Sequence, residues 1–254
     1  MHPNLDEPLD VLLRPDSIVG EGNLVDRVHR TLRTAIIEVR LRPHRALSEK
    51  DVAKCLDVSK TPVREAMIRL VEERLVRVVP KSGTTVSPID IERFREGCFA
   101  RLHLEAAAIA QAAVLRTDAH ILQLKANLSR QRQVLADEAY WDFFLCDEQF
   151  HAIIMTAAGL PGLVPILELA KVEVDRIRSL KNKLGIRRTE TVLRQHAEIV
   201  EAIVARDPGR AVEAIHAHLG AVDARLWELG ENYDLWNFIE TVNRPTRIRV
   251  AVSA

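Results

Sequence analysis

Apolar residues in the N-terminal third of the chain recur every three or four residues, a spacing that predicts helices with one buried face. The first helix ends before Pro43, and Ser48 is a candidate N-cap for a second, short helix. Ser59 can cap a third helix, with Pro62 in its first turn. The apolar faces of the three helices consist of Leu24, Val28, Leu32, Ala35, Ile36 and Val39, then Val52, Ala53 and Leu56, then Val63, Ala66, Met67, Leu70 and Val71.

Two β-rich runs follow the third helix. Residues 75–79 and 84–87 are rich in Val and Thr, and they flank a turn that ends at Gly83. Together with the helices before it, this hairpin predicts a winged helix-turn-helix over residues 23–88. Residues 1–22 show no sustained period and carry several prolines, so we expect a mobile N-terminal arm there.

The rest of the chain is almost entirely helix-periodic. Turn signals such as Asp207-Pro208-Gly209 separate the periodic segments. Six antiparallel helices with short connections predict a bundle domain over residues 89–230, followed by a C-terminal helix and tail over residues 231–254. The fold class is therefore mainly α, with an N-terminal winged helix-turn-helix, its small β-wing, and a C-terminal antiparallel all-helical bundle. The expected bundle helices lie near 90–115, 118–136, 139–158, 162–182, 186–206 and 208–230.

The composition of the 254 residues agrees with this fold class. Hydrophobic residues make up 47% and charged residues 28%, as in ordinary globular proteins, while 4% aromatic residues disfavour an all-β fold. Cys55, Cys98 and Cys146 form no C-x-x-C pair, so neither a disulfide framework nor a thiolate zinc site is expected. The chain has no run of about 18 apolar residues and no leader-like N-terminus, so we expect a cytoplasmic protein without a membrane segment.

The net charge of zero conceals an asymmetry along the chain. Residues 23–88 contain 14 Lys and Arg against 8 Asp and Glu, whereas the remainder contains 22 basic and 28 acidic residues. A basic part joined to an acidic part indicates nucleic-acid binding by the basic one. The alternative is an ordinary three-helix domain whose charges are merely solvated.

Several side chains in the basic part have the length and position to contact DNA. In a winged helix-turn-helix the N-terminal end of the motif's second helix enters the major groove. Lys60 and Arg64 are four residues apart there and share one helical face, while Lys50 begins the preceding helix. Gly83 allows the wing tip to approach the minor groove. The candidate contacts to double-stranded operator DNA are Lys50, Ser59, Lys60, Thr61, Arg64, Lys81 and Gly83.

The same region resembles a known family. Leu47-Ser48-Glu49-Lys50-Asp51-Val52-Ala53 and Val58-Ser59-Lys60-Thr61-Pro62-Val63-Arg64-Glu65-Ala66 closely resemble the winged-helix signature of GntR-family bacterial transcriptional regulators. The resemblance implies that Lys50, Lys60 and Arg64 contact DNA. That family usually has Arg at the first two positions, and Lys lacks the fork that reads guanine, so affinity should survive better than sequence discrimination.

Three other positions depart from that family, which usually has Gly where this chain has Val39, His44 and Arg74. Each position lies at or near a turn, and non-glycine residues with positive φ are costly. We therefore expect these turns to differ in geometry or to carry strain.

A second set of residues points to a metal site in the helical domain. Asp147 and His151 are four residues apart on one helix face, while His196 and His218 lie in two further helices. Inward-facing helices of a bundle can bring such side chains to one ion. One carboxylate and three imidazoles suit one divalent transition metal per chain, Zn²⁺ first and Ni²⁺, Mn²⁺ or Fe²⁺ as alternatives. From spacing alone, ordinary packed or surface histidines are the simpler explanation.

The sequence around these residues resembles the FCD domain, the effector domain of the FadR subfamily of GntR regulators. The similar blocks are Asp147-Glu148-Gln149-Phe150-His151, Gln195-His196-Ala197-Glu198-Ile199 and His218-Leu219, within a resemblance that spans about residues 90–229. In metal-binding members of that subfamily these positions ligate the ion. The resemblance therefore implies a metal held by Asp147, His151, His196 and His218.

Arg101 and Glu105 also look like the Arg and Glu of the first helix of that domain. An Arg that faces a metal-containing cavity suits a carboxylate, so Arg101 is the candidate contact to a small organic-acid effector. The alternative is an ion pair between Arg101 and Glu105 within one helix. His103 and His216 point away from these faces and are not included.

The leading hypothesis is a ligand-responsive transcriptional repressor. A small carboxylate would bind at the metal and shift a homodimer between DNA-competent and DNA-incompetent arrangements. We expect no enzymatic activity, because no general base or nucleophile accompanies the four candidate ligands. Two alternatives stay open: a metal-dependent enzyme that uses the Asp and three His, and a regulator whose metal is purely structural.

Overall fold

The computed structural model of the chain describes residues 7–79, 83–220 and 231–245. The chain separates into two compact units. The first consists of Met1–Asp90, Asp175–Leu184 and Asn232–Ala254, and the second of Ile91–Val174 and Gly185–Glu231. The domain boundaries expected from the sequence stay a prediction, and the first unit differs from them because it takes in two later segments of the chain.

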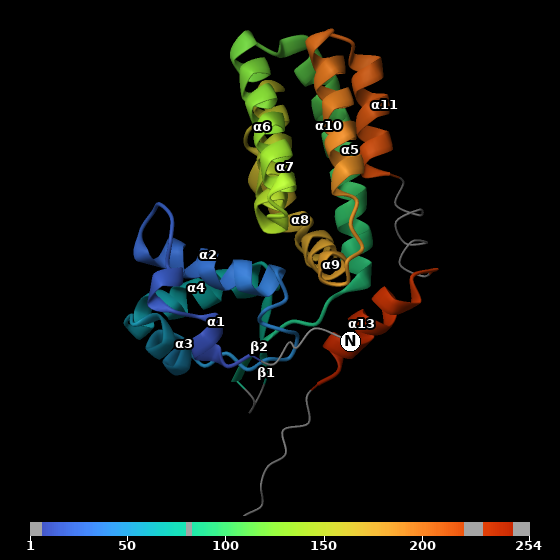
Figure 1. Ribbon diagram of the computed structural model, residues 1–254. Coiled ribbons are helices and arrows are strands. Elements are labelled where there is room, and N and C mark those ends of the chain that lie inside the picture. Colours follow the sequence, from blue (N-terminus) through green and yellow to red (C-terminus); the bar gives the residue numbers. More distant parts are fainter. Residues whose placement is uncertain (1–6, 80–82, 221–230, 246–254) are drawn as a thin grey trace, which may run out of the picture. The chain divides into compact units, whose positions relative to one another are not determined.

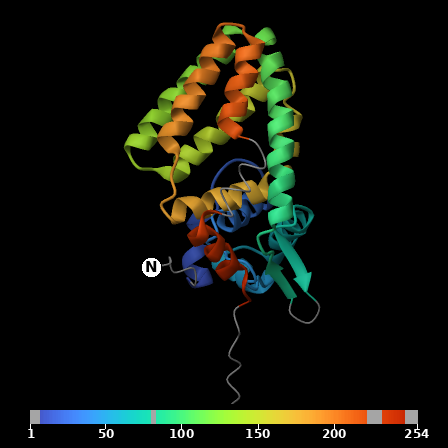
Figure 2. The same ribbon diagram turned by 90° about the vertical axis from the view of Figure 1, so that its right-hand side faces the viewer.

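The first unit contains the predicted winged helix-turn-helix. Its wing is an antiparallel pair of strands (Figure 2). In this pair Val76 lies opposite Val86, and Val79 lies opposite Gly83. The third helix of the motif packs against both of the others. The elements are α2 (Leu24–Ile37), α3 (Glu49–Leu56), α4 (Lys60–Glu72), β1 (Val76–Val79) and β2 (Gly83–Val86).

The helix starts follow the predicted caps in part. The Ser48 side chain accepts a hydrogen bond from the Asp51 N–H and caps α3, as predicted. Ser59 occupies the N-cap position of α4 but makes no side-chain capping bond, so the cap predicted there is wrong. Leu24 and Val71 lie at helix ends, and they are therefore exposed rather than part of the buried faces.

Three turns in this unit carry backbone strain. Val39, His44 and Arg74 have φ values of 52°, 64° and 59°, the left-handed region that costs a residue with a side chain about 1–2 kcal/mol. Val39 and Arg74 each follow the C-cap of a helix, α2 and α4, at the position where glycine is usual. Of the two outcomes expected for these positions, strain is therefore the one observed.

Residues 9–18, within the expected mobile N-terminal arm, contain short elements of regular structure that the sequence pattern did not predict. Helix α1 (Leu9–Leu12) packs against α3 and is followed by a 3-10 turn (Pro15–Ser17). Leu12, Leu13 and Ile18 are buried. Helical periodicity needs a window of about 11 residues or more, so an apolar anchor this short gives no periodic signal.

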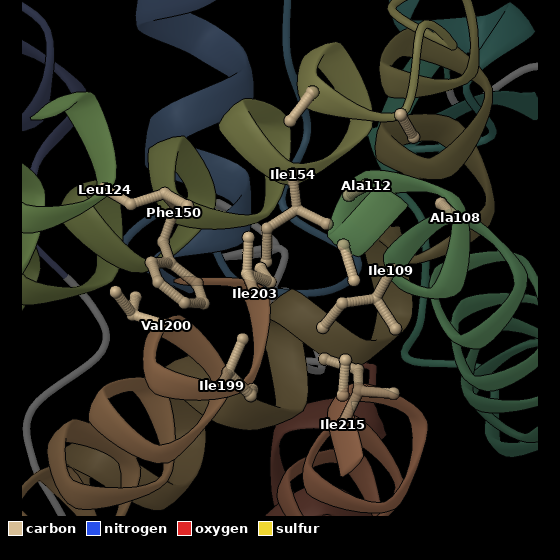
Figure 3. Close-up of a cluster of buried hydrophobic side chains, with 14 of the residues drawn as sticks. Ala108, Ile109, Ala112, Leu124, Phe150, Ile154, Ile199, Val200, Ile203 and Ile215 are labelled. Carbon is tan, nitrogen blue, oxygen red and sulfur yellow. The ribbon is translucent and has the colours of Figure 1, made fainter. Parts of the chain in front are cut away.

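The second unit is a helical bundle (Figure 1). The long helix α5 packs against α7, α8, α10 and α11, and α6 packs against α7 and α10. Apolar side chains from these helices form one core, in which Ile109, Phe150, Ile154, Ile203 and Ile215 lie close together (Figure 3). The helices are α5 (Ile91–Leu115), α6 (Asp118–Ala136), α7 (Tyr140–Ala157), α8 (Leu163–Ala170), α10 (Thr189–Val204) and α11 (Pro208–Leu219).

Two predicted helices of the bundle differ in the structure. The segment 162–182 forms α8 and a separate helix α9 (Val172–Lys183), with a break at Lys171, whose ammonium group is buried against Glu148. The helix predicted over 208–230 ends at Leu219, because Gly220 takes a φ of 73°. Residues 221–230 lie outside the described part of the chain.

Helix α5 is long and apolar enough by composition to cross a membrane. However, it carries a buried ion pair, Arg101 with Glu105, and it packs against four other helices. Both features are typical of the core helix of a bundle.

A C-terminal helix, α13 (Tyr233–Asn243), belongs to the first unit and buries Leu235, Phe238, Ile239 and Val242. The Asn243 side chain accepts a hydrogen bond from the Ile89 N–H at 2.8 Å and donates one to the Ile89 carbonyl at 2.9 Å. The predicted terminal helix is thus present. The predicted tail lies mostly in residues 246–254, which the structure does not describe.

Candidate metal centre and DNA-binding surface

Four polar side chains from three helices meet inside the second unit. Asp147 and His151 lie one turn apart on α7, His196 lies on α10 and His218 on α11, and all four are buried. One ligand atom from each residue lies within 4.8 Å of all the others. The structure thus brings together the four residues that the sequence proposed as metal ligands.

The three imidazoles face one another through their Nε2 atoms. His218 Nε2 lies 3.3 Å from Nε2 of His196 and 3.3 Å from Nε2 of His151. His196 Nε2 also lies 3.5 Å from Asp147 Oδ1. Phe150 stacks on the His196 ring with a centroid distance of 4.0 Å, so packing fixes that ring from its apolar side.

A hydrogen bond outside the cluster determines which nitrogen of His218 carries the hydrogen. Gln195 Nε2 donates to the Ala217 carbonyl at 3.0 Å, so Gln195 Oε1 is the atom that faces His218 Nδ1 at 3.3 Å. An acceptor at that place requires a hydrogen on Nδ1 and leaves a lone pair on Nε2. Burial, and then the neighbouring histidines, lower the pKa of His218 well below its ordinary value, so the ring is neutral near pH 7.

A longer chain of amides does the same for His196. Asn127 Nδ2 donates to the Cys146 carbonyl at 3.0 Å, so Asn127 Oδ1 accepts from Gln131 Nε2 at 2.7 Å. Gln131 Oε1 then faces His196 Nδ1 at 2.9 Å. His196 therefore carries a hydrogen on Nδ1 and, as a neutral ring, presents the lone pair of Nε2 to the cluster.

A buried ion pair orients His151. Its Nδ1 lies 2.5 Å from Glu105 Oε2, off the ideal hydrogen-bond direction, and Glu105 Oε1 accepts a hydrogen bond from Arg101 Nε at 2.7 Å. Burial by itself raises the pKa of Glu105, but the interactions with His151 and Arg101 outweigh burial and set this pKa at about 2. Glu105 is therefore a carboxylate, and it draws the hydrogen of His151 to Nδ1.

With all three rings in their neutral forms, three Nε2 lone pairs and the side chain of Asp147 converge on one buried point. Groups of this kind repel one another, and a cation is the partner that satisfies all of them. Nitrogen and carboxylate donors without thiolates suit Zn²⁺, Ni²⁺, Mn²⁺ or Fe²⁺. The donor set and its tautomers therefore fit a divalent transition metal.

The amides that fix these tautomers were not predicted from the sequence. Asn127 and Gln131 lie four residues apart on the buried face of α6, and Gln195 directly precedes His196. The sequence signal that could have identified them is an amide side chain at a position of a helix that faces the core. Buried amides need hydrogen-bond partners, so such a residue is expected to bond to another buried polar group.

A pocket opens beside this cluster, with a volume of about 330 Å³ including its mouth. Its polar lining includes Arg101, Glu105 and His151, and its apolar lining includes Met155 and Leu167. The Arg101–Glu105 pair that the sequence offered as an alternative is present, but it occupies only Nε of the guanidinium. Among the residues that the structure describes, the two terminal nitrogens of the buried Arg101 have no hydrogen-bond partner.

The candidate DNA contacts lie on the surface of the first unit. Lys50 is exposed in the first turn of α3, and the four candidates of α4 and its N-cap are exposed as well. Gly83 lies at the wing with a φ of 80° and open space where a Cβ would be. Lys81 lies outside the described residues. The candidates of α4 and its N-cap are Ser59, Lys60, Thr61 and Arg64.

Two family models match the chain, each over one part of it. The model for bacterial regulatory proteins of the gntR family matches residues 24–86, and the FCD domain model matches residues 96–221. The first range contains the winged helix-turn-helix, and the second contains the four clustered side chains.

Individual proteins show the same similarity. The HTH-type transcriptional repressor RspR of Escherichia coli strain K12 is 31% identical over 210 residues, which are 83% of this chain and 92% of RspR. The crystal structure of a GntR transcriptional regulator from Rhodococcus sp. RHA1 is 25% identical, with a TM-score of 0.65 over 81% of this chain and 97% of that one. E. coli McbR/YncC, at 22% identity and a TM-score of 0.70 over 84% of this chain and all of its own, shares the fold.

Proposed function

The chain belongs to the GntR family of bacterial regulatory proteins, with an FCD domain as its second part, and we infer that this transcriptional regulator is a ligand-responsive repressor. The repressor role is supported by the name of RspR, because the alignment with RspR covers most of both chains. A role at operator DNA also agrees with the cytoplasmic location expected from the sequence.

We propose that α4 enters the major groove of the operator. Lys60, Thr61 and Arg64 would contact bases and phosphates, with Lys50 on the backbone and Gly83 of the wing near the minor groove. The exposure of these residues at the N-terminal end of α4 supports this assignment. A homodimer would place two such helices on an inverted repeat, because a two-fold axis relates both the protomers and the half-sites.

Asp147, His151, His196 and His218 would hold one divalent transition metal, with Zn²⁺ as the first expectation and Ni²⁺, Mn²⁺ or Fe²⁺ as alternatives. Four protein ligands include a single carboxylate, so a divalent ion would leave one unit of positive charge in a buried site. When bound, the metal supplies a Lewis-acidic position for an anionic oxygen. That charge balance supports an anionic effector.

Arg101 would bind the other end of the same anion. Arg101 and His151 both line the pocket, and a planar guanidinium binds two carboxylate oxygens at once. Glu105 holds Nε of Arg101 and the ring of His151, so one carboxylate would orient both the effector contact and a metal ligand. The supported effector class is a small organic acid.

The observation that carries the proposal is the convergence of three Nε2 atoms and Asp147 beside a buried arginine. The test is operator binding by metal-loaded and chelator-treated protein across a panel of mono-, di- and hydroxycarboxylic acids. We expect one class of acid to change operator affinity at least tenfold, and only in the metal-loaded protein. Affinity that ignores every acid would contradict effector control, and turnover of an acid would favour a metal-dependent enzyme.

A further inference from the structure

Glu49 and Arg64 form a forked contact on the surface of the helix-turn-helix. Glu49 is the first residue of α3, and Arg64 is the fifth residue of α4. Arg64 Nε lies 3.2 Å and 3.1 Å from the two carboxylate oxygens of Glu49, and Arg64 Nη2 lies 3.0 Å from Oε2. The carboxylate therefore occupies the Nε–Nη2 edge of the guanidinium.

This contact has little effect on folding stability. The side chain of Arg64 is 66% exposed and that of Glu49 is 35% exposed, and exposed ion pairs of this kind contribute little because water screens them. What the pair does restrict is the conformation of a long, flexible side chain. An arginine held in place before binding loses less rotamer freedom when it contacts a ligand.

The edge that Glu49 leaves open matches one base. A guanidinium has five N–H donors, and with the Nε–Nη2 edge occupied, Nη1 and the outer hydrogen of Nη2 form a parallel pair that points away from Glu49. Such a pair fits O6 and N7 of guanine in the major groove. Lys50 and Lys60 have ammonium groups and cannot form this fork, so among these three basic residues Arg64 alone can read guanine in this way.

Glu49 would also lower the affinity for DNA that lacks the operator sequence. A carboxylate beside the groove repels phosphates, which weakens binding to all DNA. This loss of binding free energy is offset only at a DNA site where a guanine lies opposite the guanidinium that Glu49 holds. Glu49 therefore increases the difference in affinity between the operator and other DNA, which is the quantity that specificity requires.

We propose that Glu49 is a positioning residue for sequence recognition, which holds the guanidinium of Arg64 in the plane that reads a guanine of each operator half-site. This inference rests on the proposed role of α4 as the recognition helix. It adds a specificity residue on α3 that does not itself need to touch DNA.

The experiment uses the full chain and a duplex that the wild type selects from a random pool. Dissociation constants are measured at fixed salt for that duplex, for variants with each G·C pair replaced, and for unrelated DNA. In Glu49→Gln we expect the ratio between the selected duplex and its G·C variant to fall about tenfold, while binding to unrelated DNA becomes tighter. Glu65→Gln removes one exposed acid that directly follows Arg64 on α4, and in this control the ratio should stay unchanged.

A double-mutant cycle separates positioning from charge. In Arg64→Ala the selected duplex and its G·C variant should already bind with similar dissociation constants. Adding Glu49→Gln to this variant should not change the ratio of the two constants further. An unchanged ratio in Glu49→Gln, with a collapsed ratio in Arg64→Ala, overturns the role of Glu49 and leaves α4 as the recognition helix. If Arg64→Ala keeps the ratio, or the wild type selects no sequence, the recognition role of α4 fails as well.

Discussion

His196 Nε2 lies 3.3 Å from His218 Nε2, and in neutral rings with the hydrogen on Nδ1 neither of these nitrogens has a hydrogen to give to the other. Both rings already donate the hydrogen of Nδ1 to glutamine oxygens, His196 to Gln131 and His218 to Gln195. Two lone pairs at this distance in a buried site repel each other. The arrangement of the rings therefore supports the proposal that the two nitrogens share a cation.

Removal of one imidazole should release the metal. We expect purified wild type to contain about one divalent transition metal per chain, because the folded bundle holds the proposed ligands together. His218→Ala removes one of the four proposed ligands, so we expect this variant to lose most of the metal. The melting temperature should fall as well, since the ion stabilises only the folded state. Elemental analysis measures the metal content. His216→Ala, an exposed histidine two residues earlier on α11, is the control and should keep the metal. Equal metal in both variants would mean that His218 is not a ligand.

The amide chain behind His196 should matter almost as much as the ligand. Gln131→Met keeps the volume of the side chain but removes the acceptor for His196 Nδ1–H, so the ring loses its fixed tautomer. We expect metal affinity to fall about 10- to 100-fold, as for other groups that orient a ligand. Competition with a chelator of known affinity measures this. Gln133→Met, at an exposed position two residues later, should leave the affinity unchanged, and equal affinities in the two variants would contradict the role of Gln131.

The strained turns predict opposite effects for one type of substitution. Arg74 is exposed, so Arg74→Gly should raise the free energy of unfolding by up to about 1 kcal/mol through relief of its positive φ. Val39 has a similar φ but is fully buried, and Val39→Gly also removes a side chain whose burial contributes about 1.5–3 kcal/mol. We expect Val39→Gly to be destabilising. Urea unfolding of both variants decides this, and destabilisation by Arg74→Gly would show that the turn is not strained.

The ion pair at the end of α4 predicts a pH dependence of stability. Partial burial raises the pKa of Glu73, but the hydrogen bond from His29 and the charge of Arg33 outweigh it and lower this pKa below its ordinary value. The stabilisation is therefore complete above the ordinary glutamate pKa of about 4.3 and is lost as pH falls towards the folded-state value. Glu73→Gln should lower stability near pH 7 and flatten its loss between about pH 5 and 3. The exposed neighbour gives the control Glu72→Gln, which should keep the slope of the wild type.

The fold was predictable where a helix carries one long apolar face. The three helices of the winged helix-turn-helix appear where the three- and four-residue spacing predicted them. The pattern failed at Lys171, where a buried ammonium group interrupts the predicted helix, since a lysine in a helical window gives no sign that it will be buried. It also failed at Leu12 and Leu13, because four residues of helix are too few to show a period.

The clustering of the four candidate ligands was predictable from the sequence, but the groups that orient them were not. Asp147 and His151 share a helix face by spacing, and the resemblance to the FCD domain related them to His196 and His218 on other helices. The amide chain behind His196 depends on side-chain directions in three dimensions, which one sequence does not encode as a spacing. Glu49 was missed for the same reason, because its partner Arg64 lies fifteen residues away on another helix.

The last prediction concerns the pocket beside the metal ligands. A small organic acid at about 100 times its dissociation constant should raise the melting temperature of metal-loaded protein by about 5 °C, because binding to the folded state alone stabilises it. Arg101→Gln should remove most of that rise, since the two terminal nitrogens of Arg101 are the ones left for an anion. Removal of the metal should do the same, because both contacts share one ligand.

The readout for Arg101 is the rise produced by the acid, not the melting temperature itself, because Arg101→Gln also removes one of the two partners of the buried Glu105, the other being His151. Arg95→Gln is the control, because Arg95 lies on the same helix, is exposed, and forms an ion pair at the surface with Glu92. The rise should be full in Arg95→Gln and small in Arg101→Gln. A full rise in both would mean that Arg101 serves only to hold Glu105, and that the acid binds elsewhere. If the acid still raises the melting temperature of metal-free protein, but not that of Arg101→Gln, the effector binds without contacting the ion. The metal would then have a structural role.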